Sequence, residues 1–315
     1  MKYCRPIKTI FIGTPDFGVP SLRALINDQE IDVALVITQP DMPVGRKQII
    51  TASPVKQVAL ENQLKVLQPE KIKTIVDQIR QIAPDVIIVI AYAQIIPKSI
   101  LDIPKLGCVN LHGSLLPKYR GAAVIQAPIL NGDQSSGLTL IKMDEGIDTG
   151  PIISQVKIKL DSHENGDSLY NKLSAISADF LVDSIKKYAD EKIKPIPQAD
   201  TAETTYFSKI KKADGLIEWH KSAAEIERFI RAMHAWPSAW TWHQGKQVKI
   251  IEVQQTPIEM NAYKPGKTFI YNHGLAVQCG HDSLIIKKIQ MEGKKVLTAE
   301  EFIRGNSNFV GAILS

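Results

Sequence analysis

The sequence predicts an α/β protein with a Rossmann-like, doubly wound and mostly parallel sheet, followed by a small C-terminal β-barrel of OB-like type. Apolar runs alternate with helical patterns over the first 189 residues, as in βαβ units. The run at 85–91 is nearly all apolar, which is typical of a central parallel strand covered on both faces. After residue 209 the pattern changes to short strands of alternating polarity, which indicates a separate β-rich module.

The helices and strands of the first domain are predicted from apolar runs, helical spacing and the residues that bound them. Apolar runs predict strands at 7–13, 31–38, 85–91, 107–112, 136–142 and 152–160. Helical spacing predicts helices at 17–26, 122–130 and 167–189, with a further strand–helix pair within 65–83. Ser53 has the character of an N-cap, with Pro54 at the first helical position. The polar segment 39–51 between these elements is expected to be a long loop.

Three segments are expected along the chain. Residues 1–189 form the catalytic domain, and 190–208 form a linker, because it contains Pro195 and Pro197 and few large apolar residues. Residues 209–315 form the β-barrel domain. Its expected elements are a helix at 221–233 and strands at 247–253, 268–271, 274–279 and 283–290.

Composition excludes several classes of protein. Of 315 residues, 44% are hydrophobic and 23% charged, which is ordinary for a globular chain. No apolar run is long enough to span a bilayer and no signal peptide pattern precedes the first strand, so we expect a cytoplasmic protein without a membrane segment. The three cysteines are far apart and no HExxH pair occurs, so we expect neither a disulfide framework nor a metal. The net charge of +5 lies mainly in the C-terminal third, which is compatible with a polyanionic partner such as RNA.

The first βα turn does not support the common nucleotide-binding functions. Gly13-Thr14-Pro15-Asp16-Phe17-Gly18 has a proline where the second glycine of GxGxxG belongs, which disfavours a nicotinamide dehydrogenase. No GxxxxGK[ST] motif occurs, so a P-loop NTPase is unsupported.

The strongest polar cluster contains Asn110 and His112, two residues apart at the end of a predicted strand. Both side chains therefore leave the same face of the sheet, at its carboxyl edge. An amide that can donate to an oxyanion beside an imidazole that can take a proton suits attack on a carbonyl. The alternative is a buried histidine bonded to an asparagine in a turn, and the spacing alone leaves both open.

Three further segments have two interpretations each. Asp148, in the glycine-bounded run 144–150, could orient a histidine, or the run could be an ordinary turn. The 39–51 segment could be a functional loop or a solvated, mobile insertion. The tryptophans within 230–240 could stack on bases, although packing is the commoner role.

With these motifs the chain closely resembles the methionyl-tRNA formyltransferases over essentially its whole length. The shared motifs are Gly13-Thr14-Pro15-Asp16-Phe17, Thr38-Gln39-Pro40-Asp41, Ser53-Pro54-Val55-Lys56, Asn110-x-His112-Gly-Ser-Leu-Leu-Pro, Tyr119-Arg120-Gly121-Ala122-Ala123, Met143-Asp144-x-Gly146-x-Asp148-Thr149-Gly150, Ile210-x-Lys212-x-Asp214 and Ile230-Arg231-Ala232 through Trp236-Pro237. The resemblance implies formyl transfer from 10-formyltetrahydrofolate to the α-amino group of methionine on initiator tRNA, by a monomer without a metal.

The resemblance also implies roles for particular residues. Asn110 would bond the formyl oxygen, His112 would shuttle protons, and Asp148 would orient His112 and balance its charge. The residues implied at the folate site are Tyr92, Ala93, Ser114, Leu115, Leu116 and Pro117. The residues implied in tRNA binding are Arg46, Lys47, Lys209, Lys211 and Lys212.

Three positions depart from the family pattern, and two alternatives stay open. The loop reads Gly45-Arg46-Lys47-Gln48-Ile49, which is less basic than the family's usual run; Ala93 stands where a glycine is common, and Val124 where a proline is usual. A related enzyme could formylate another amine, such as glycinamide ribonucleotide or an amino-sugar nucleotide. A non-catalytic RNA-binding protein with a relict α/β domain is the other alternative.

Overall fold

The computed structural model describes residues 5–45, 47–199 and 204–315. The chain divides into two compact units. Unit 1 comprises Met1–Val124, Ser135–Lys159 and Tyr170–Phe207, and unit 2 comprises Ile125–Gln134, Leu160–Leu169 and Ser208–Ser315. No helix among the described residues is long and apolar enough to cross a membrane.

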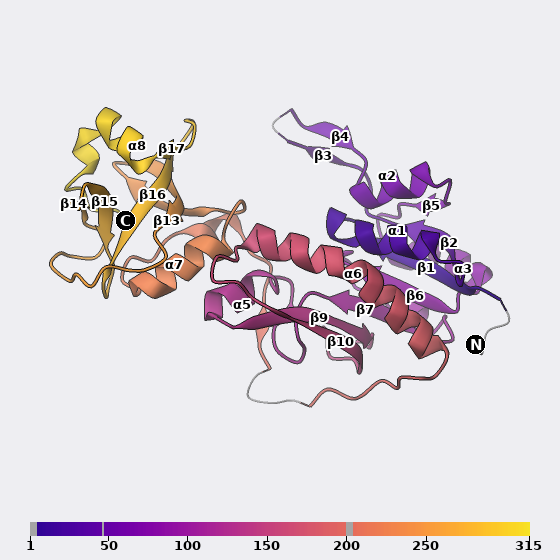
Figure 1. Cartoon of the computed structure of the whole chain (residues 1–315). Helices are drawn as coiled ribbons and strands as arrows, with labels where there is room; N and C mark the ends of the chain where they lie inside the picture. Colours follow the sequence, from indigo (N-terminus) through magenta and orange to yellow (C-terminus); the bar gives the residue numbers. More distant parts are fainter. Residues whose placement is uncertain (1–4, 46, 200–203) are drawn as a thin grey trace. The chain divides into compact units, whose positions relative to one another are not determined.

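Unit 1 is built on a sheet that, within the described chain, has seven strands in the order β10-β9-β7-β6-β1-β2-β5 (Figure 1). The strands are β1 (Ile7–Gly13), β2 (Ile31–Ile37), β5 (Val66–Leu67), β6 (Val86–Ile90), β7 (Cys108–His112), β9 (Ser135–Lys142) and β10 (Ile152–Lys159). Neighbours from β5 to β7 are parallel, whereas β9 is antiparallel to both β7 and β10. The prediction of a mostly parallel sheet is therefore confirmed.

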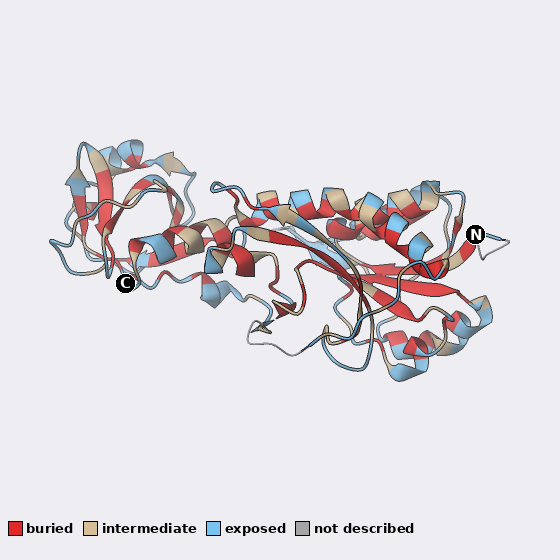
Figure 2. Cartoon of the chain, turned by 60° about the horizontal axis from the view of Figure 1, so that its bottom comes forward, coloured by how far each residue is buried: buried red, intermediate tan, exposed pale blue. Residues whose placement is uncertain are grey.

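Helices cover both faces of this sheet, and Figure 2 shows a largely buried interior. Strands β1, β6, β7 and β9 are almost wholly buried, whereas the edge strand β10 has one buried residue and three exposed ones. On one face, α1 (Val19–Asn27) lies beside α6 (Gly166–Ala189), joined by a 2.7 Å hydrogen bond between the hydroxyls of Ser21 and Ser177. On the other face, a core of isoleucines packs α3 (Val76–Ile82) and α4 (Lys98–Leu101) against β1 and β6. Because strand side chains alternate, this two-sided burial is what nearly continuous apolar strands require.

Of two helices predicted in this domain, one begins at its expected cap and the other begins later than expected. Ser53 accepts a hydrogen bond from Lys56 N and so caps α2 (Pro54–Glu61), as predicted. Helix α5 (Gln126–Asn131) begins four residues later than the expected 122. Pro128 then lies in its first turn, where a missing N–H breaks no intrahelical bond.

The segment expected as a loop at 39–51 instead contains a two-stranded hairpin. Strands β3 (Met42–Val44) and β4 (Ile49–Thr51) are antiparallel, and all six residues are exposed. At the base of the hairpin Asp41 accepts hydrogen bonds from Lys56 Nζ at 2.6 Å and from Gln68 Nε2 at 2.8 Å. These bonds lower the pKa of the Asp41 carboxyl. They also tie the hairpin to the body of unit 1.

The expected linker 190–208 is in large part packed on unit 1. Strand β11 (Tyr206–Phe207) pairs in parallel with β8 (Arg120–Gly121), and Ile196 forms an antiparallel bridge with Ile152. We call residues 196–199 and 204–207 the strap. Because its bonds are made by backbone and amide groups, an apolar pattern could not indicate them.

Unit 2 contains a second sheet in the order β12-β13-β16-β15-β14, with β17 paired to β16. Its strands are β12 (Ala239–His243), β13 (Lys246–Val253), β14 (Thr268–Tyr271), β15 (Gly274–Gln278), β16 (Ser283–Met291) and β17 (Leu297–Thr298). Helices α7 (Ala223–Ala232) and α8 (Ala299–Gly305) each begin with a capping box and pack on the apolar face of the sheet. Short 3-10 turns occur at Asp16–Gly18, Ile72–Ile75, Lys212–Gly215 and Ser307–Phe309.

Candidate active site

The candidate site begins at the carboxyl end of β7, which supplies Asn110 and His112. Strand β7 pairs with β6 at Val89↔Asn110 and with β9 at His112↔Thr139, so its end lies in the middle of the sheet edge. His112 is only 5% exposed, while Asn110 is half-buried. The edge at which parallel strands end is where open α/β sheets bind ligands.

Asp148 reaches both of these side chains from the turn between β9 and β10. Its Oδ1 accepts a hydrogen bond from Asn110 Nδ2 at 3.2 Å and lies 3.5 Å from His112 Nδ1. Its Oδ2 accepts from the backbone N–H of Gly121 at 2.9 Å. The three residues singled out in the sequence are thus brought together around one carboxylate.

The hydrogen bond on the far side of His112 determines which ring nitrogen can act. Nε2 lies 2.8 Å from the carbonyl oxygen of Tyr119, which can only accept. The neutral ring therefore carries its proton on Nε2 and leaves Nδ1 as the basic nitrogen, next to Asp148. A proton taken by Nδ1 would place a positive imidazolium beside that carboxylate, which stabilises it.

The segment 114–117 is held rigidly beside His112. Thr139 Oγ1 donates to the carbonyl of Ser114 at 2.6 Å and accepts from Leu116 N at 3.1 Å, while Gln155 donates to the carbonyl of Leu116 at 2.9 Å. The Ser114 hydroxyl is buried and donates to the carbonyl of Lys118 at 2.8 Å. Ser114 therefore shapes the segment, and nothing in its contacts prepares it as a nucleophile.

The other part of the expected folate site, Tyr92 and Ala93, follows β6 and offers backbone groups rather than a polar side chain. The Tyr92 side chain is buried in the core, which raises its pKa to about 12, and its hydroxyl has no hydrogen-bond partner in the described chain. Its carbonyl accepts from Gln39 Nε2 at 2.9 Å. Ala93 is exposed with a φ of 65°, a left-handed conformation that favours glycine. No hydrogen bond among the described residues joins Tyr92 or Ala93 to 114–117; the two segments follow the neighbouring strands β6 and β7.

The residues expected to bind tRNA are spread over both units. Arg46 lies outside the described residues. Lys47 is exposed on the hairpin, and Lys209, Lys211 and Lys212 are exposed at the start of the C-terminal part of unit 2.

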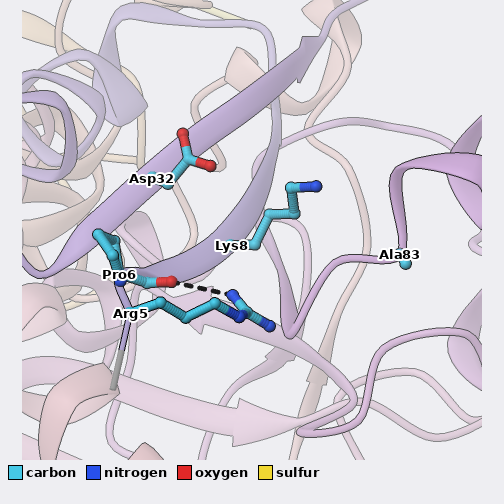
Figure 3. A pocket seen from close by; sticks show the side chains of 5 residues that line it. All are labelled: Arg5, Pro6, Lys8, Asp32 and Ala83. Carbon is cyan, nitrogen blue, oxygen red and sulfur yellow. Dashed lines mark hydrogen bonds between the residues drawn. The ribbon is translucent and has the colours of Figure 1, made fainter. Parts of the chain in front are cut away.

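The described part of the chain contains no group of three His, Cys, Asp or Glu that could hold a metal. A hollow of about 380 Å³ is lined by Arg5, Pro6, Lys8, Asp32 and Ala83 (Figure 3). These residues stand at the amino ends of the strands, the edge opposite His112, and Arg5 is already paired with Asp85.

Several supporting residues gave no sequence signal. Thr139 and Gln155 read as ordinary strand residues, and Gln198 lay in the expected linker. Gln198 donates to the carbonyl of Asp148 from 50 positions away. Thr139, Gln155 and Gln198 reach the site because the folded sheet places distant parts of the chain next to one another.

Comparison with known proteins gives consistent results for both parts of the chain. The Formyl transferase family model matches residues 7–185, and the Formyl transferase, C-terminal domain model matches 209–307. The methionyl-tRNA formyltransferase of Lachnospira eligens is 41% identical over 98% of this chain and 99% of its own. That of Thermodesulfovibrio yellowstonii is 44% identical over 94% and 95%. An N-formyltransferase structure from Helicobacter canadensis, in complex with folinic acid and dTDP-3-aminofucose, has 22% identity, a TM-score of 0.67 and covers 90% of this chain and 99% of its own.

Proposed function

The chain belongs to the methionyl-tRNA formyltransferase family, and on that premise we propose that it transfers the formyl group of 10-formyltetrahydrofolate to the α-amino group of methionine on initiator tRNA. The mechanism rests on one observation: the side chains of Asn110 and His112 both lie against the carboxylate of Asp148. This arrangement offers a donor for a developing oxyanion and a base for an amine proton.

The reaction needs little activation of the nucleophile. An α-amine has a pKa of roughly 7.7–8.0, so part of it is neutral near pH 7 and can attack the formyl carbon. One hydrogen of Asn110 Nδ2 serves Asp148, and we assign the other to the formyl oxygen as charge grows there.

His112 accepts the proton of the attacking amine and passes it on. Its Nδ1 takes the proton that the amine loses on attack, and the imidazolium returns it to the departing nitrogen of the folate as the carbon–nitrogen bond breaks. Asp148 stabilises the imidazolium between the two steps. No metal is required for this sequence.

Replacing His112 tests the proposal most directly. We expect His112→Ala to lower the turnover of initiator Met-tRNA about 100-fold or more, because acid–base catalysis is lost. His163→Ala, at an exposed histidine, is the matched control. A near-normal rate for His112→Ala overturns the assignment, and equal formylation of initiator and elongator Met-tRNA overturns the proposed substrate.

We assign tRNA binding to the hairpin and to the domain at 209–315. The exposed lysines Lys209, Lys211 and Lys212 would contact phosphates, so the affinity for tRNA should fall steeply with salt. Arg46→Ala should weaken use of Met-tRNA and spare folate binding. Equal loss of both would contradict this role.

We also propose that the sheet of unit 2 closes into a small OB-like barrel. Supporting this, the last residues of the chain bond to both edge strands: Trp242 N donates to the carbonyl of Ser315 at 2.7 Å, and Thr268 N donates to that of Ala312 at 2.9 Å. The enzyme is proposed to work as a monomer in the cytoplasm, and sedimentation in the presence and absence of tRNA tests the first point.

A further inference from the structure

The geometry points to Gln198 as a positioning residue for the formyl transfer, acting through the backbone of Asp148. This inference rests on the proposed function. The Gln198 amide donates through Nε2 to the carbonyl of Asp148 at 2.8 Å and to that of Gly150 at 2.7 Å. A single side chain thus holds the backbone of Asp148 and, two residues on, of Gly150.

This turn is one that needs to be held. Asp148 has a φ of 54°, a left-handed conformation that non-glycine residues adopt at a cost of about 1–2 kcal/mol. Such a conformation persists only where the surroundings fix it. Its carboxylate must reach Asn110, His112 and the N–H of Gly121 at once, so a small rotation of the backbone breaks these contacts.

Gln198 is itself fixed by a buried cation. Its Oε1 accepts from Arg120 Nη2 at 3.0 Å and from Nε at 3.3 Å, and Arg120 is only 4% exposed. Because the guanidinium occupies the oxygen, the amide can present only its NH₂ group to the two carbonyls. Arg120 Nη1 also donates to the hydroxyl of Tyr206 at 3.3 Å, at the other end of the strap.

The strap reaches the histidine side of the site as well. The hydroxyl of Thr205 accepts from Tyr119 N at 3.0 Å, and the carbonyl of Thr205 accepts from Arg120 N at 2.7 Å. Tyr119 is the residue whose carbonyl bonds His112 Nε2. The strap therefore supports His112 through Tyr119 and supports Asp148, which stabilises the imidazolium, through Gln198.

An isosteric substitution separates donation from packing. Gln198→Glu keeps the size of the side chain and its acceptor for Arg120, but its carboxylate cannot donate to the carbonyls of Asp148 and Gly150. We expect the single-turnover rate of formyl transfer to fall about 10- to 100-fold, with KM values for both substrates and the unfolding midpoint near those of the unaltered chain. Gln198→Ala removes the same donors without adding a charge and should also slow the reaction.

A double-mutant cycle with Asp148→Ala tests whether the effect passes through the carboxylate. In that background Gln198→Glu should change the rate of formyl transfer less than about 2-fold, which is roughly the error of such a cycle. Ile196→Ala is the matched control, because this strap residue is exposed and makes its bridge through the backbone. It should leave the rate unchanged.

Several outcomes overturn the inference. They are a normal rate in Gln198→Glu, a normal rate in Gln198→Ala, an additive loss in the cycle, or an equal loss in Ile196→Ala. Failure of the proposed function has a different signature: the unaltered chain would not formylate Met-tRNA, or Asp148→Ala alone would react at the normal rate.

Discussion

The Asp148→Asn substitution tests the site most sharply, because it preserves the shape of the side chain, removes its charge and replaces one accepting oxygen with an NH₂ donor. The carboxylate now receives hydrogens on both oxygens, from Asn110 Nδ2 and from the N–H of Gly121. An amide offers only one accepting oxygen. Backbone N–H groups cannot turn round, so the oxygen should stay with Gly121 and the new NH₂ should face Asn110.

Asn110 then has to turn its own oxygen toward residue 148, and its NH₂ moves away from the formyl oxygen. Loss of one oxyanion donor lowers kcat about 100- to 1000-fold, and His112 loses the charge that stabilises its protonated form as well. We therefore expect kcat to fall at least about 100-fold. KM should change little, because the 114–117 and 92–93 segments make no described contact with Asp148.

The assay is formylation of initiator Met-tRNA at saturating 10-formyltetrahydrofolate, with the unfolding midpoint measured in parallel. A kcat within 5-fold of that of the unaltered enzyme, which is about 1 kcal/mol in the barrier, would refute the reasoning. A large fall in the unfolding midpoint would refute it as well, because the turn that carries residue 148 is expected to stay intact.

Three further predictions concern stability. Tyr92→Phe should raise the free energy of unfolding by about 1 kcal/mol in urea titration, because it removes a buried hydroxyl that lacks a partner in the described chain; a loss of stability would show that the hydroxyl is bonded. Gly121→Ala should destabilise the protein by about 2 kcal/mol or more, since the φ is 102° and a Cβ would meet the carbonyl oxygen of Phe207; a neutral result contradicts the packing of the strap. Burial lowers the pKa of His243, whose ring packs on Phe309, so unit 2 should lose stability as the pH falls below about 6.5. His243→Phe should weaken this pH dependence in unfolding midpoints measured from pH 8 to 5.5. An unchanged pH dependence would show that His243 is not its cause.

The sheet of unit 1 was predictable because its strands are buried on both faces. Runs such as Val86–Ile90 are apolar at every position, and this pattern needs no knowledge of the partners. The same holds for the shared face of Asn110 and His112, which the two-residue period of a strand determines. Asp148 is different, since its contacts depend on a turn 38 positions from Asn110, and the spacing alone left an ordinary turn open.

The hairpin was missed for a physical reason. Met42–Val44 and Ile49–Thr51 are exposed throughout, so no alternation of buried and exposed positions marks them as strands. Their pairing is local, and Asp41 anchors the hairpin at its base. Burial patterns report on cores, and a hairpin without a core contact leaves no such trace.

The strap shows why a polar, proline-containing segment is not necessarily a linker. Its hydrogen bonds are made by an amide, a hydroxyl and backbone groups, and a buried guanidinium completes them; none of these groups has a periodicity in sequence. Gln198 lies 78 positions from Arg120 and 50 from Asp148, so only the folded chain reveals what it does. Because Tyr206 and Phe207 are paired to the strand beside the site and Lys209 follows two residues after Phe207, the chain is held at the catalytic residues just before it enters the domain assigned to tRNA. A variant that frees the strap should therefore lower the rate of formyl transfer before it lowers the affinity for tRNA.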